Sequence, residues 1–403
     1  MKRLTVTHWV FVGMVVGVVI GAAAPEFGKD LEIISKIFLR LIKSIIAPLL
    51  FGTLVAGIAG SGSAKTMGRV GGKAMAYFLA ATSLALLIGL VAVNLVQPGA
   101  GMTIQTAASD AVKAGKQPTF ASFLEHAIPQ SVIGAMAEGE VLQLVIFCLI
   151  FGAACTIVGA KAKPVVEFAE SLAEVMFQYT KYVMYLAPFA VGAAIAVVIG
   201  REGLGVLFNL GKLILTVFGA LVFFVVAVLG VVTVAFKIPL GRLIQAVKDP
   251  WLLAFSTASS ESALPMALQN MEKFGVPKHI VGLVLPLGYS FNLDGTTLYL
   301  SAASIFVAQM AGVNMTVGQQ LLIMATLLLT SKGVAGVPRA SLVVLLATLS
   351  AFNLPPEGVT VILGVDAILD MARTSVNVLG NCVASAVVAR WEGVDLSSPP
   401  PHA

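Results

Sequence analysis

The first 240 residues are dominated by long, nearly unbroken runs of apolar side chains. A hydrocarbon core of about 30 Å requires roughly 20 such residues in one helix. Helices also satisfy their backbone polar groups within one segment, and the alternating polarity of a membrane β-strand is absent. The runs therefore predict membrane helices near residues 7–24, 36–60, 74–97, 141–159, 174–200 and 205–236.

After residue 250 the apolar runs are interrupted. "WLLAFSTASSESALPMAL" has hydroxyl side chains and Glu261 at its centre, and the next run is broken by "NLDGT". "LLLTSKGVAGVPRASLVVLL" then places Gly333, Gly336 and Pro338 between apolar arms. Such paired interruptions are typical of transporters whose site lies near the bilayer midplane, where opened backbone faces a cavity. We expect a broken hairpin, an interrupted helix, a second broken hairpin and a final long helix.

The final helix carries a polar stripe. Its polar residues recur at i, i+4, i+7, i+8, i+11 and i+15 and so share one face: Asp366, Asp370, Arg373, Thr374, Asn377 and Asn381. A charge at the centre of a membrane helix costs about 2.5–3.5 kcal/mol, so several on one helix indicate a function. A structural alternative is that Asp370 and Arg373 merely pair at i and i+3. That pairing would not require the opened backbone predicted nearby.

Composition supports a multi-pass membrane protein, because the chain is 58% hydrophobic and only 11% charged. The net charge of +5 does not indicate nucleic-acid binding, since the basic residues are scattered in short loops. They alternate between loops as the positive-inside rule expects for a cytoplasmic amino terminus. The opening run could be a cleaved signal peptide, but the many later runs favour a first membrane helix. The three cysteines imply neither a disulfide framework nor a metal site.

An enzyme is not predicted, because the four histidines are widely separated and no H-E-x-x-H or G-x-S-x-G occurs. A pore is a stronger alternative, since serine, glycine and aspartate side chains could line one. Channels, however, usually present rings from repeated subunits. The mixture of both charge signs on one stretch instead suits a zwitterion, and a membrane receptor without transport is a further alternative.

Four motifs together resemble the dicarboxylate/amino acid:cation symporters, the glutamate transporter family, and most closely its bacterial proton/sodium-glutamate branch. They are "AFSTASSESALP", "SFNLDGTTLY", "SKGVAGVP" and "DMARTSVNVLGN". The resemblance implies an all-α integral membrane fold of eight transmembrane helices and two re-entrant hairpins with inverted repeats, assembled as a homotrimer. It implies six helices in residues 1–249, combining scaffold elements with the third and sixth helices of the transport domain. The rest of the transport core follows at 250–393, with a disordered tail at 394–403.

The resemblance also implies a substrate site for an acidic amino acid. Arg373 corresponds to the residue that holds the side-chain carboxylate, and Asp370 to the residue that receives the α-ammonium group. The groups around the α-carboxylate correspond to Ser260, Thr296, Thr374, Asn377 and the backbone near Val337. Asp366 is expected to orient the helix from behind the site.

A second set of residues corresponds to cation ligands. Oxygen donors suit a hard cation, and the set consists of Thr82, Ser83, Gly288, Ser290, Asn292, Asp294, Ser331, Asn377 and Asn381. Many sodium-coupled relatives have an aspartate at the position of Asn381, so we expect fewer sodium ions here, or a proton in place of one. For Glu261 two roles are open. Its side chain either caps a helix or contacts entering water, or it carries a proton. Arg339 also departs from relatives, and it either reaches outward or biases the gate.

The expected function is import of glutamate or aspartate, coupled to Na⁺, H⁺ or both by alternating access, with no organic cofactor. The expected location is the inner membrane of a bacterium, with both termini cytoplasmic. Asp370 favours an amino acid over a C4-dicarboxylate, which remains the alternative within transporters. An anion channel is the alternative from a different class.

Overall fold

The computed structural model describes residues 6–59, 65–102, 128–138, 141–332 and 341–396. Helices α1 to α12, with the short helical segments η1 and η2, form the first part of the chain. Their bounds are α1 Val6–Ala23, α2 Pro25–Asp30, α3 Glu32–Ala59, α4 Lys65–Val96, α7 Val132–Glu138, α8 Val141–Val158, η1 Gly159–Ala162, α9 Lys163–Met184, α10 Ala187–Glu202, α11 Gly205–Phe223, η2 Phe224–Gly230 and α12 Val231–Ala235.

The later helices are α13 Leu240–Thr257, α14 Ser260–Phe274, α15 Lys278–Phe291, α16 Asp294–Met310, α17 Val317–Thr330, α18 Ser341–Ala351 and α19 Gly358–Trp391. No strand occurs among the described residues, which fits the all-α class predicted from the apolar runs. Among the described residues, three helices are long and apolar enough to cross a membrane: Arg69–Val96, Ile146–Val183 and Gly205–Ala235. Several shorter apolar helices accompany them.

One predicted helix is wrong in its bounds. The run at 174–200 is divided between α9 and α10, which are separated at Tyr185 and Leu186. Pro188 lies in the first turn of α10, where its missing N–H removes no helical hydrogen bond. The same residue inside one continuous helix would remove such a bond, so the chain ends α9 and starts again. The run at 205–236 is helical throughout but has π-helical geometry over Phe224–Gly230.

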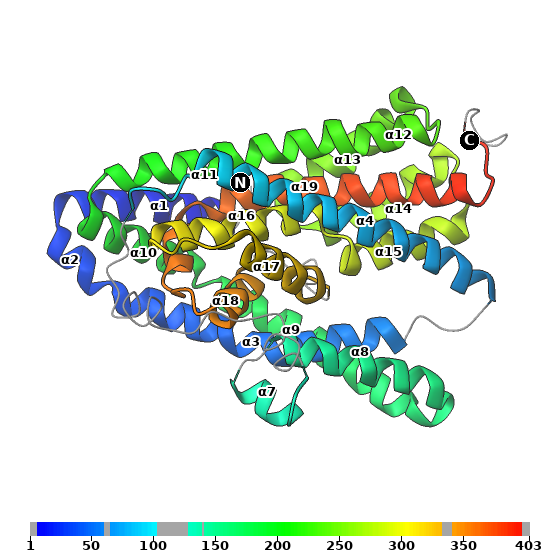
Figure 1. The fold of residues 1–403 in the computed structure, drawn as a ribbon, viewed down its shortest axis with the longest axis horizontal. Helices are drawn as coiled ribbons and strands as arrows, with labels where there is room; N and C mark the ends of the chain where they lie inside the picture. The colour runs from blue at the N-terminus through cyan, green and yellow to red at the C-terminus, as the bar shows by residue number, and fades with distance from the viewer. Residues whose placement is uncertain (1–5, 60–64, 103–127, 139–140, 333–340, 397–403) are drawn as a thin grey trace, which may run out of the picture.

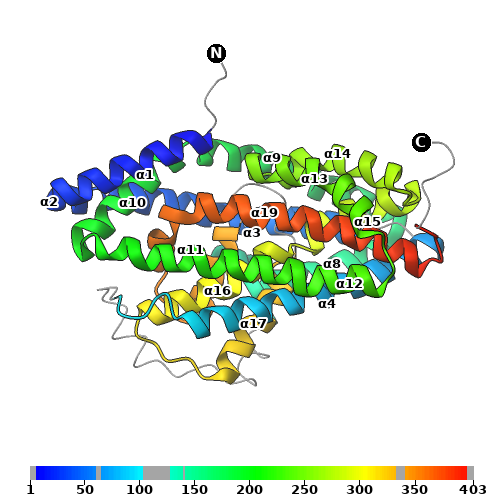
Figure 2. The ribbon, with the colours of Figure 1, turned by 90° about the horizontal axis from the view of Figure 1, so that it is seen from above.

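Helix α19 is the centre of the second half of the molecule. It contacts α4, α10, α11 and α13 to α16. Figure 1 shows it running beside α16 and α4, and Figure 2 shows it between α11 on one side and α13 on the other. Most of its residues are buried over its whole length. Because the helix is buried on all sides, its polar stripe faces other parts of the protein, as is possible for a helix that is not amphipathic. The amino-terminal helices pack largely among themselves, α1 with α10 and α3 with α8 and α9.

The predicted interruptions are present where the structure describes them. Helices α13 and α14 form a packed pair joined at Ala258, whose φ of 49° is left-handed, and at Ser259, which caps α14. Pro265, expected near this break, lies inside α14 instead. The next break separates α15 from α16 at Asn292 and Leu293. In the second hairpin, α17 and α18 are described, whereas residues 333–340 between them lie outside the described part.

The first residues of the expected carboxyl-terminal tail, 394–396, belong to the described part of the structure. Leu396 is buried, and its carbonyl oxygen accepts a hydrogen bond of 2.9 Å from Arg242 Nη1. Arg390 also pairs with Asp395 at 3.3 Å. Residues 397–403 lie outside the described part of the chain.

Candidate functional site

The buried charged residues of the described chain lie close to the breaks predicted from sequence. They are Asp294, Lys332, Asp366, Asp370 and Arg373. Charges removed from solvent are costly unless they are paired and hydrogen-bonded. Three of them come from α19, one begins α16 and one follows α17. The buried charged side chains therefore lie where the interrupted helix, the second hairpin and α19 meet.

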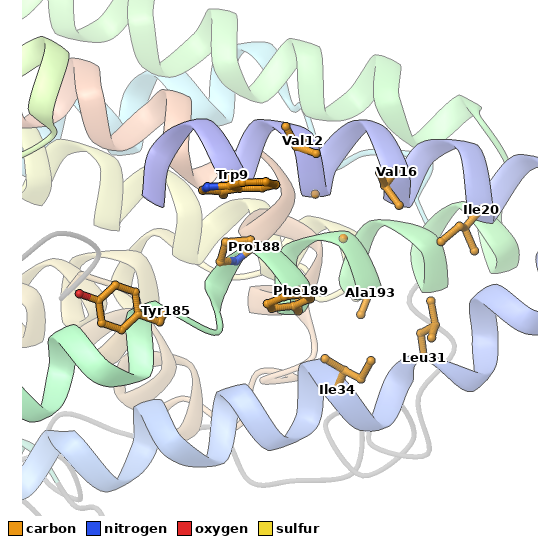
Figure 3. A pocket seen from close by; sticks show the side chains of 12 residues that line it. Trp9, Val12, Val16, Ile20, Leu31, Ile34, Tyr185, Pro188, Phe189 and Ala193 are labelled. Carbon is orange, nitrogen blue, oxygen red and sulfur yellow. The ribbon is translucent and has the colours of Figure 1, made fainter. Parts of the chain in front are cut away.

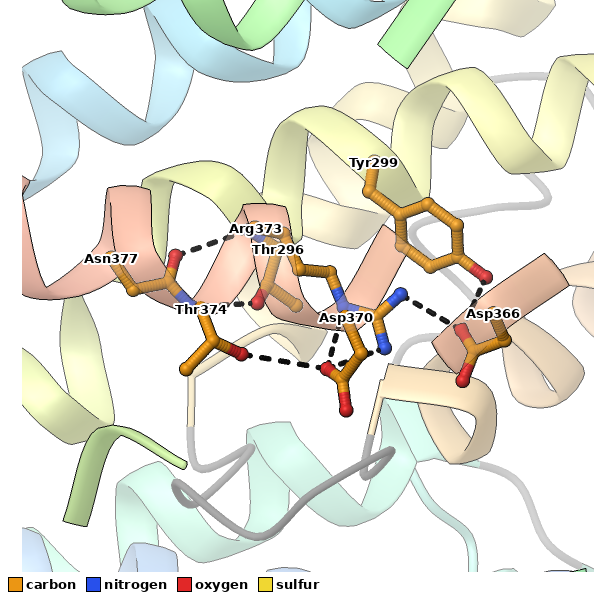
Figure 4. Close-up of polar contacts among 7 residues, drawn as sticks. All are labelled: Thr296, Tyr299, Asp366, Asp370, Arg373, Thr374 and Asn377. Atoms are coloured by element: carbon orange, nitrogen blue, oxygen red, sulfur yellow. Dashed lines mark hydrogen bonds and ion pairs between the residues drawn. The ribbon is translucent and has the colours of Figure 1, made fainter. Parts of the chain in front are cut away.

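Arg373 is held between two carboxylates of its own helix. Its Nη1 donates to Asp366 Oδ1 at 2.9 Å and its Nε to Asp370 Oδ1 at 3.0 Å (Figure 4). The guanidinium carbon lies 4.2 Å from the centre of the Tyr299 ring, a cation–π geometry. Tyr299 in turn donates its hydroxyl to Asp366 Oδ1 at 3.2 Å. We call Asp366, Asp370, Arg373 and Tyr299 the arginine cluster.

The pairing of Asp370 with Arg373 that we considered as a structural alternative is therefore present. It does not use the whole guanidinium, however. Arg373 Nη2 lies 2.8 Å from Asp370 Oδ1, but no acceptor lies in hydrogen-bond geometry for it among the described residues. A guanidinium carries five N–H donors in a fixed fork. The cluster thus keeps donors that an anionic ligand can use.

One turn further along α19, Asn377 joins the helix to α16. Its Nδ2 donates to Thr296 Oγ1 at 2.9 Å, and its Oδ1 accepts from the Thr296 backbone N–H at 3.1 Å (Figure 4). A β-carbon on Gly295 would collide with the Arg373 carbonyl oxygen, so α16 approaches α19 this closely because residue 295 is glycine. Thr374 Oγ1 lies 3.5 Å from Asp370 Oδ1.

A second cluster lies at the break between α15 and α16. Asn292 Nδ2 donates to Asp294 Oδ2 and to Asn381 Oδ1, both at 3.1 Å. A β-carbon on Gly288 would collide with the same Asn381 oxygen. Lys332 Nζ donates to the Phe291 carbonyl oxygen at 2.6 Å and to Thr82 Oγ1 at 3.0 Å. We call Thr82, Asn292, Asp294, Lys332 and Asn381 the amide cluster.

The amide cluster contains polar atoms that have no protein partner among the described residues. They are Asn292 Oδ1, Asp294 Oδ1 and Asn381 Nδ2, and Ser331 Oγ, next to Lys332 in the sequence, is a further atom of this kind. Buried polar atoms without a partner are rare in proteins, and each one requires an explanation. Carboxylate, amide and hydroxyl oxygens are the ligands that hard cations prefer. The chemistry of this donor set therefore fits a small cation such as Na⁺.

Other predicted site residues are placed less centrally. Ser83 Oγ donates to the Leu79 carbonyl oxygen at 2.8 Å, so its hydroxyl is hydrogen-bonded within α4. Ser290 is only half-buried, in the last turn of α15. Ser260 is buried in the first turn of α14, a helix that contacts α19. Predictions for Gly333, Gly336, Val337, Pro338 and Arg339, and for the side chain of Glu261, lie outside the described part of the structure.

Sequence reasoning missed Tyr299 and Lys332, and it gave Asp366 too distant a role. Asp366 binds the guanidinium directly. For Lys332 a signal existed, because a lysine between apolar arms of a membrane hairpin is as costly as the charges on α19. For Tyr299 no local signal existed, since its position opposite Arg373 depends on how α16 packs against α19.

A separate cavity of about 550 Å³ lies between α1, α3 and α10. Trp9, Val16, Ile34 and Phe189 are among its lining residues (Figure 3). No member of either cluster contributes to it. The cavity has no convergent polar groups to orient a charged ligand, so the two clusters are the better candidate site.

The chain is similar to known transport proteins. A sequence profile of the sodium:dicarboxylate symporter family matches residues 6–391. The proton/sodium-glutamate symport protein of Bacillus caldotenax is 41% identical, and the alignment covers 98% of this chain and 96% of that protein. The protein of the same description from Bacillus subtilis is 40% identical, with 98% and 95% covered. The C4-dicarboxylate transport protein of Pseudomonas syringae pv. tomato is 44% identical, with 95% and 85% covered.

Proposed function

We infer that this chain, which belongs to the sodium:dicarboxylate symporter family, is a secondary active symporter that imports glutamate or aspartate. We propose that Na⁺, H⁺ or both move with the amino acid by alternating access. The names of its relatives support this proposal, since both glutamate and C4-dicarboxylate transport proteins align over nearly the whole chain. Identity alone does not separate these two substrates, so the side chains of the site must do so.

The observation that carries the choice is the buried neighbourhood of Arg373 and Asp370. The donors that Arg373 Nη2 retains suit the side-chain carboxylate of an acidic amino acid, because a guanidinium binds carboxylates in a planar fork. Asp370 suits the α-ammonium group. We assign the α-carboxylate to hydroxyl and amide groups nearby and to backbone of the second hairpin: Ser260, Thr296, Thr374, Asn377 and Val337.

Coupling follows from the charge of the site. Asp366 and Asp370 together outweigh Arg373, and a second carboxylate on the substrate adds further negative charge in a dry environment. Cations bound by the amide cluster would offset that charge. Asn381 supplies a neutral amide where an aspartate would supply a charge, so we propose fewer coupled sodium ions, or a proton in place of one. Glu261 is the candidate proton carrier.

A C4-dicarboxylate such as succinate is the second candidate, favoured by the 44% identity to a C4-dicarboxylate transport protein. Such a ligand has no ammonium group. Asp370 would then face a carboxylate, and like charges at close range oppose binding. We therefore rank it below an acidic amino acid.

The proposed architecture follows the family. We propose eight membrane spans and two re-entrant hairpins formed by α13–α14 and α17–α18, in a homotrimer in the inner membrane of a bacterium with cytoplasmic termini. In this proposal residues 250–393, with α4 and α11–α12, make up the transport domain. The contacts of α19 with α4, α11 and α13 to α16 support this grouping, and its contact with α10 lies at the boundary with the scaffold in this proposal. Cross-linking in membranes would test the trimer.

Uptake by the purified protein in liposomes tests the function. Labelled glutamate, aspartate and succinate are offered under an imposed sodium gradient, an imposed pH gradient or neither. We expect accumulation of glutamate or aspartate that requires a cation gradient and is outcompeted poorly by succinate. Currents without gradient-driven accumulation would instead indicate an anion channel, and binding without accumulation would indicate a receptor. Loss of uptake when sodium is absent but a pH gradient is present would exclude coupling to protons alone.

A further inference from the structure

Lys332 places an ammonium group against Thr82, one of the predicted cation ligands, and against a backbone carbonyl at the break between α15 and α16. Its Nζ donates to the Phe291 carbonyl oxygen at 2.6 Å and to Thr82 Oγ1 at 3.0 Å. The residue is only 8% exposed, so protein oxygens take the place of water around its charge. This lysine follows directly after Ser331, at the end of α17.

These acceptors are of the kind that surround an alkali-metal ion. Phe291 is the last residue of α15, and a carbonyl at a helix C-terminus lacks an intrahelical partner and carries negative partial charge. Thr82 supplies a buried hydroxyl from α4. Asp294 begins α16, three residues after Phe291, and its opposite charge favours an ammonium group nearby. A carbonyl oxygen from α15 and a hydroxyl oxygen from α4 thus accept hydrogen bonds from one nitrogen.

We propose that Lys332 is a tethered cation that takes the position of one coupled Na⁺ ion in the amide cluster. The proposal rests on the cation-coupled symport proposed above. The ammonium group offsets the charge of Asp294 and satisfies the Phe291 carbonyl without an ion from solution. The protein therefore binds one Na⁺ fewer than its oxygen ligands alone would hold. Asn292 Oδ1 and Asp294 Oδ1, which lack partners in the described structure, remain for an exchangeable cation.

A tethered charge differs from a bound ion in its dependence on salt. A sodium ion leaves the site when its concentration falls, whereas Lys332 stays with α17. The ammonium group links α17 to α4 and to the end of α15 at every sodium concentration. If Lys332 were an ordinary ion-pair partner, its removal would leave Asp294 unpaired and lower stability, but it would create no new sodium site.

Sodium binding to the purified full-length protein without substrate separates these two roles. Lys332→Met removes the charge and keeps an apolar stem, and Lys332→Arg keeps the charge. Lys212→Met is a matched control, because Lys212 lies on α11 against the Phe208 ring. Binding of radioactive sodium per chain is measured together with the rise in Tm when NaCl replaces N-methylglucamine chloride at constant ionic strength.

We expect Lys332→Met to bind one more sodium ion per chain than the unaltered protein and to show a larger sodium-dependent rise in Tm. The Lys332→Arg and Lys212→Met variants should bind the same number as the unaltered protein. An unchanged sodium count in folded Lys332→Met overturns the proposal.

If Lys332→Met unfolds in the absence of salt, its response to sodium still decides the question. Recovery of the folded state by NaCl but not by N-methylglucamine chloride supports the proposal, because a free ion then replaces the lost ammonium group. No recovery by sodium, while the double variant Lys332→Met/Asp294→Asn folds, overturns it. These binding measurements require no transport. A protein that binds sodium as expected but accumulates no substrate in liposomes would contradict the proposed function and leave this inference intact.

Discussion

The arginine cluster and the amide cluster lie next to each other along α19 but satisfy their polar groups differently. In the arginine cluster, Asp366, Asp370 and Tyr299 all contact one guanidinium or each other within 4.2 Å. In the amide cluster, carboxylate and amide oxygens outnumber the donors that reach them, and Asn292 Oδ1 and Asp294 Oδ1 have no partner in the described structure. The arginine cluster pairs its charged groups with each other, whereas the amide cluster has oxygen atoms that can coordinate a further ligand.

This difference indicates separate tasks. A ligand of the arginine cluster can use the donors that Arg373 Nη2 retains, but it also meets two carboxylates, so a molecule that carries both charge signs gains most by entering. A small cation suits the amide cluster, because two of its three atoms without a hydrogen-bond partner, Asn292 Oδ1 and Asp294 Oδ1, are oxygens, and the third is Asn381 Nδ2. Selectivity for the amino acid is therefore expected in the first cluster, and cation coupling in the second.

The largest effect should come from Arg373→Ala. Two buried carboxylates would lose their cation, at a cost of about 3–5 kcal/mol in stability. Losing a buried charged contact to the substrate costs about 2–5 kcal/mol, so uptake per folded protein should fall by roughly 30-fold or more. Arg373→Lys keeps the charge without the planar fork and should retain more stability than uptake. Full glutamate uptake by Arg373→Ala would contradict the assignment of this residue.

A substitution on the other side of the substrate should discriminate between ligands. Asp370→Asn keeps the shape and removes the charge that we assign to the ammonium group. A hydrogen bond to a charged group contributes about 1.5–3 kcal/mol, so the apparent affinity for glutamate should fall about 10- to 100-fold, while that for succinate stays equal or rises. Asp366→Asn is the matched control, because it also contacts Arg373 and should weaken both ligands alike. If Asp370→Asn weakened glutamate and succinate binding to the same extent, as expected for Asp366→Asn, Asp370 would only position Arg373 and would not bind the ammonium group.

The parts of this site that the sequence predicted are those encoded by position along one helix. The spacing of Asp366, Asp370 and Arg373 placed them on one face of α19 before any contact was known, and the contacts confirm it. The helix interruptions could also be predicted from the sequence, since "NLDGT" contains residues that favour turns and so indicates the break at Asn292.

The parts that the sequence did not predict depend on neighbours from other helices. Tyr299 contributes through the packing of α16 on α19, and Lys332 through the approach of α17 to α4 and α15. Neither approach leaves a periodic signal in a single segment. The misplaced helix at 174–200 has a different cause. The segment is apolar on both sides of the break, so its hydropathy does not mark the position, whereas Pro188 in the first turn of α10 does.

Glycine substitutions should separate the clusters by a smaller effect. The atoms nearest to a β-carbon on Gly295 belong to the backbone of Arg373, whereas those nearest to one on Gly288 belong to the side chain of Asn381. Gly295→Ala must move α16 from α19 and should lower stability by about 1–3 kcal/mol. Gly288→Ala should leave Tm nearly unchanged and alter the sodium dependence of uptake. Gly282→Ala, with nothing within 4 Å, is the control on α15. Equal changes in Tm for Gly295→Ala and Gly288→Ala would refute the contrast.

The smallest effect should arise outside both clusters, at Glu392 after the end of α19. Hydrogen bonds and charge from Lys73, with a second contribution from Arg69, lower the pKa of this carboxyl group, and Lys73 Nζ lies 2.7 Å from Glu392 Oε1. A carboxyl whose pKa is lower in the folded state stabilises the fold above its unfolded pKa, and that contribution is lost as the pH falls through the folded value. Glu392→Gln should therefore lower Tm slightly at pH 7. The difference from the unaltered protein should shrink on acidification below the ordinary carboxyl pKa, while substrate selectivity and sodium dependence stay constant. A change in sodium dependence would instead show that the charges at this end of α4 and α19 communicate with the amide cluster.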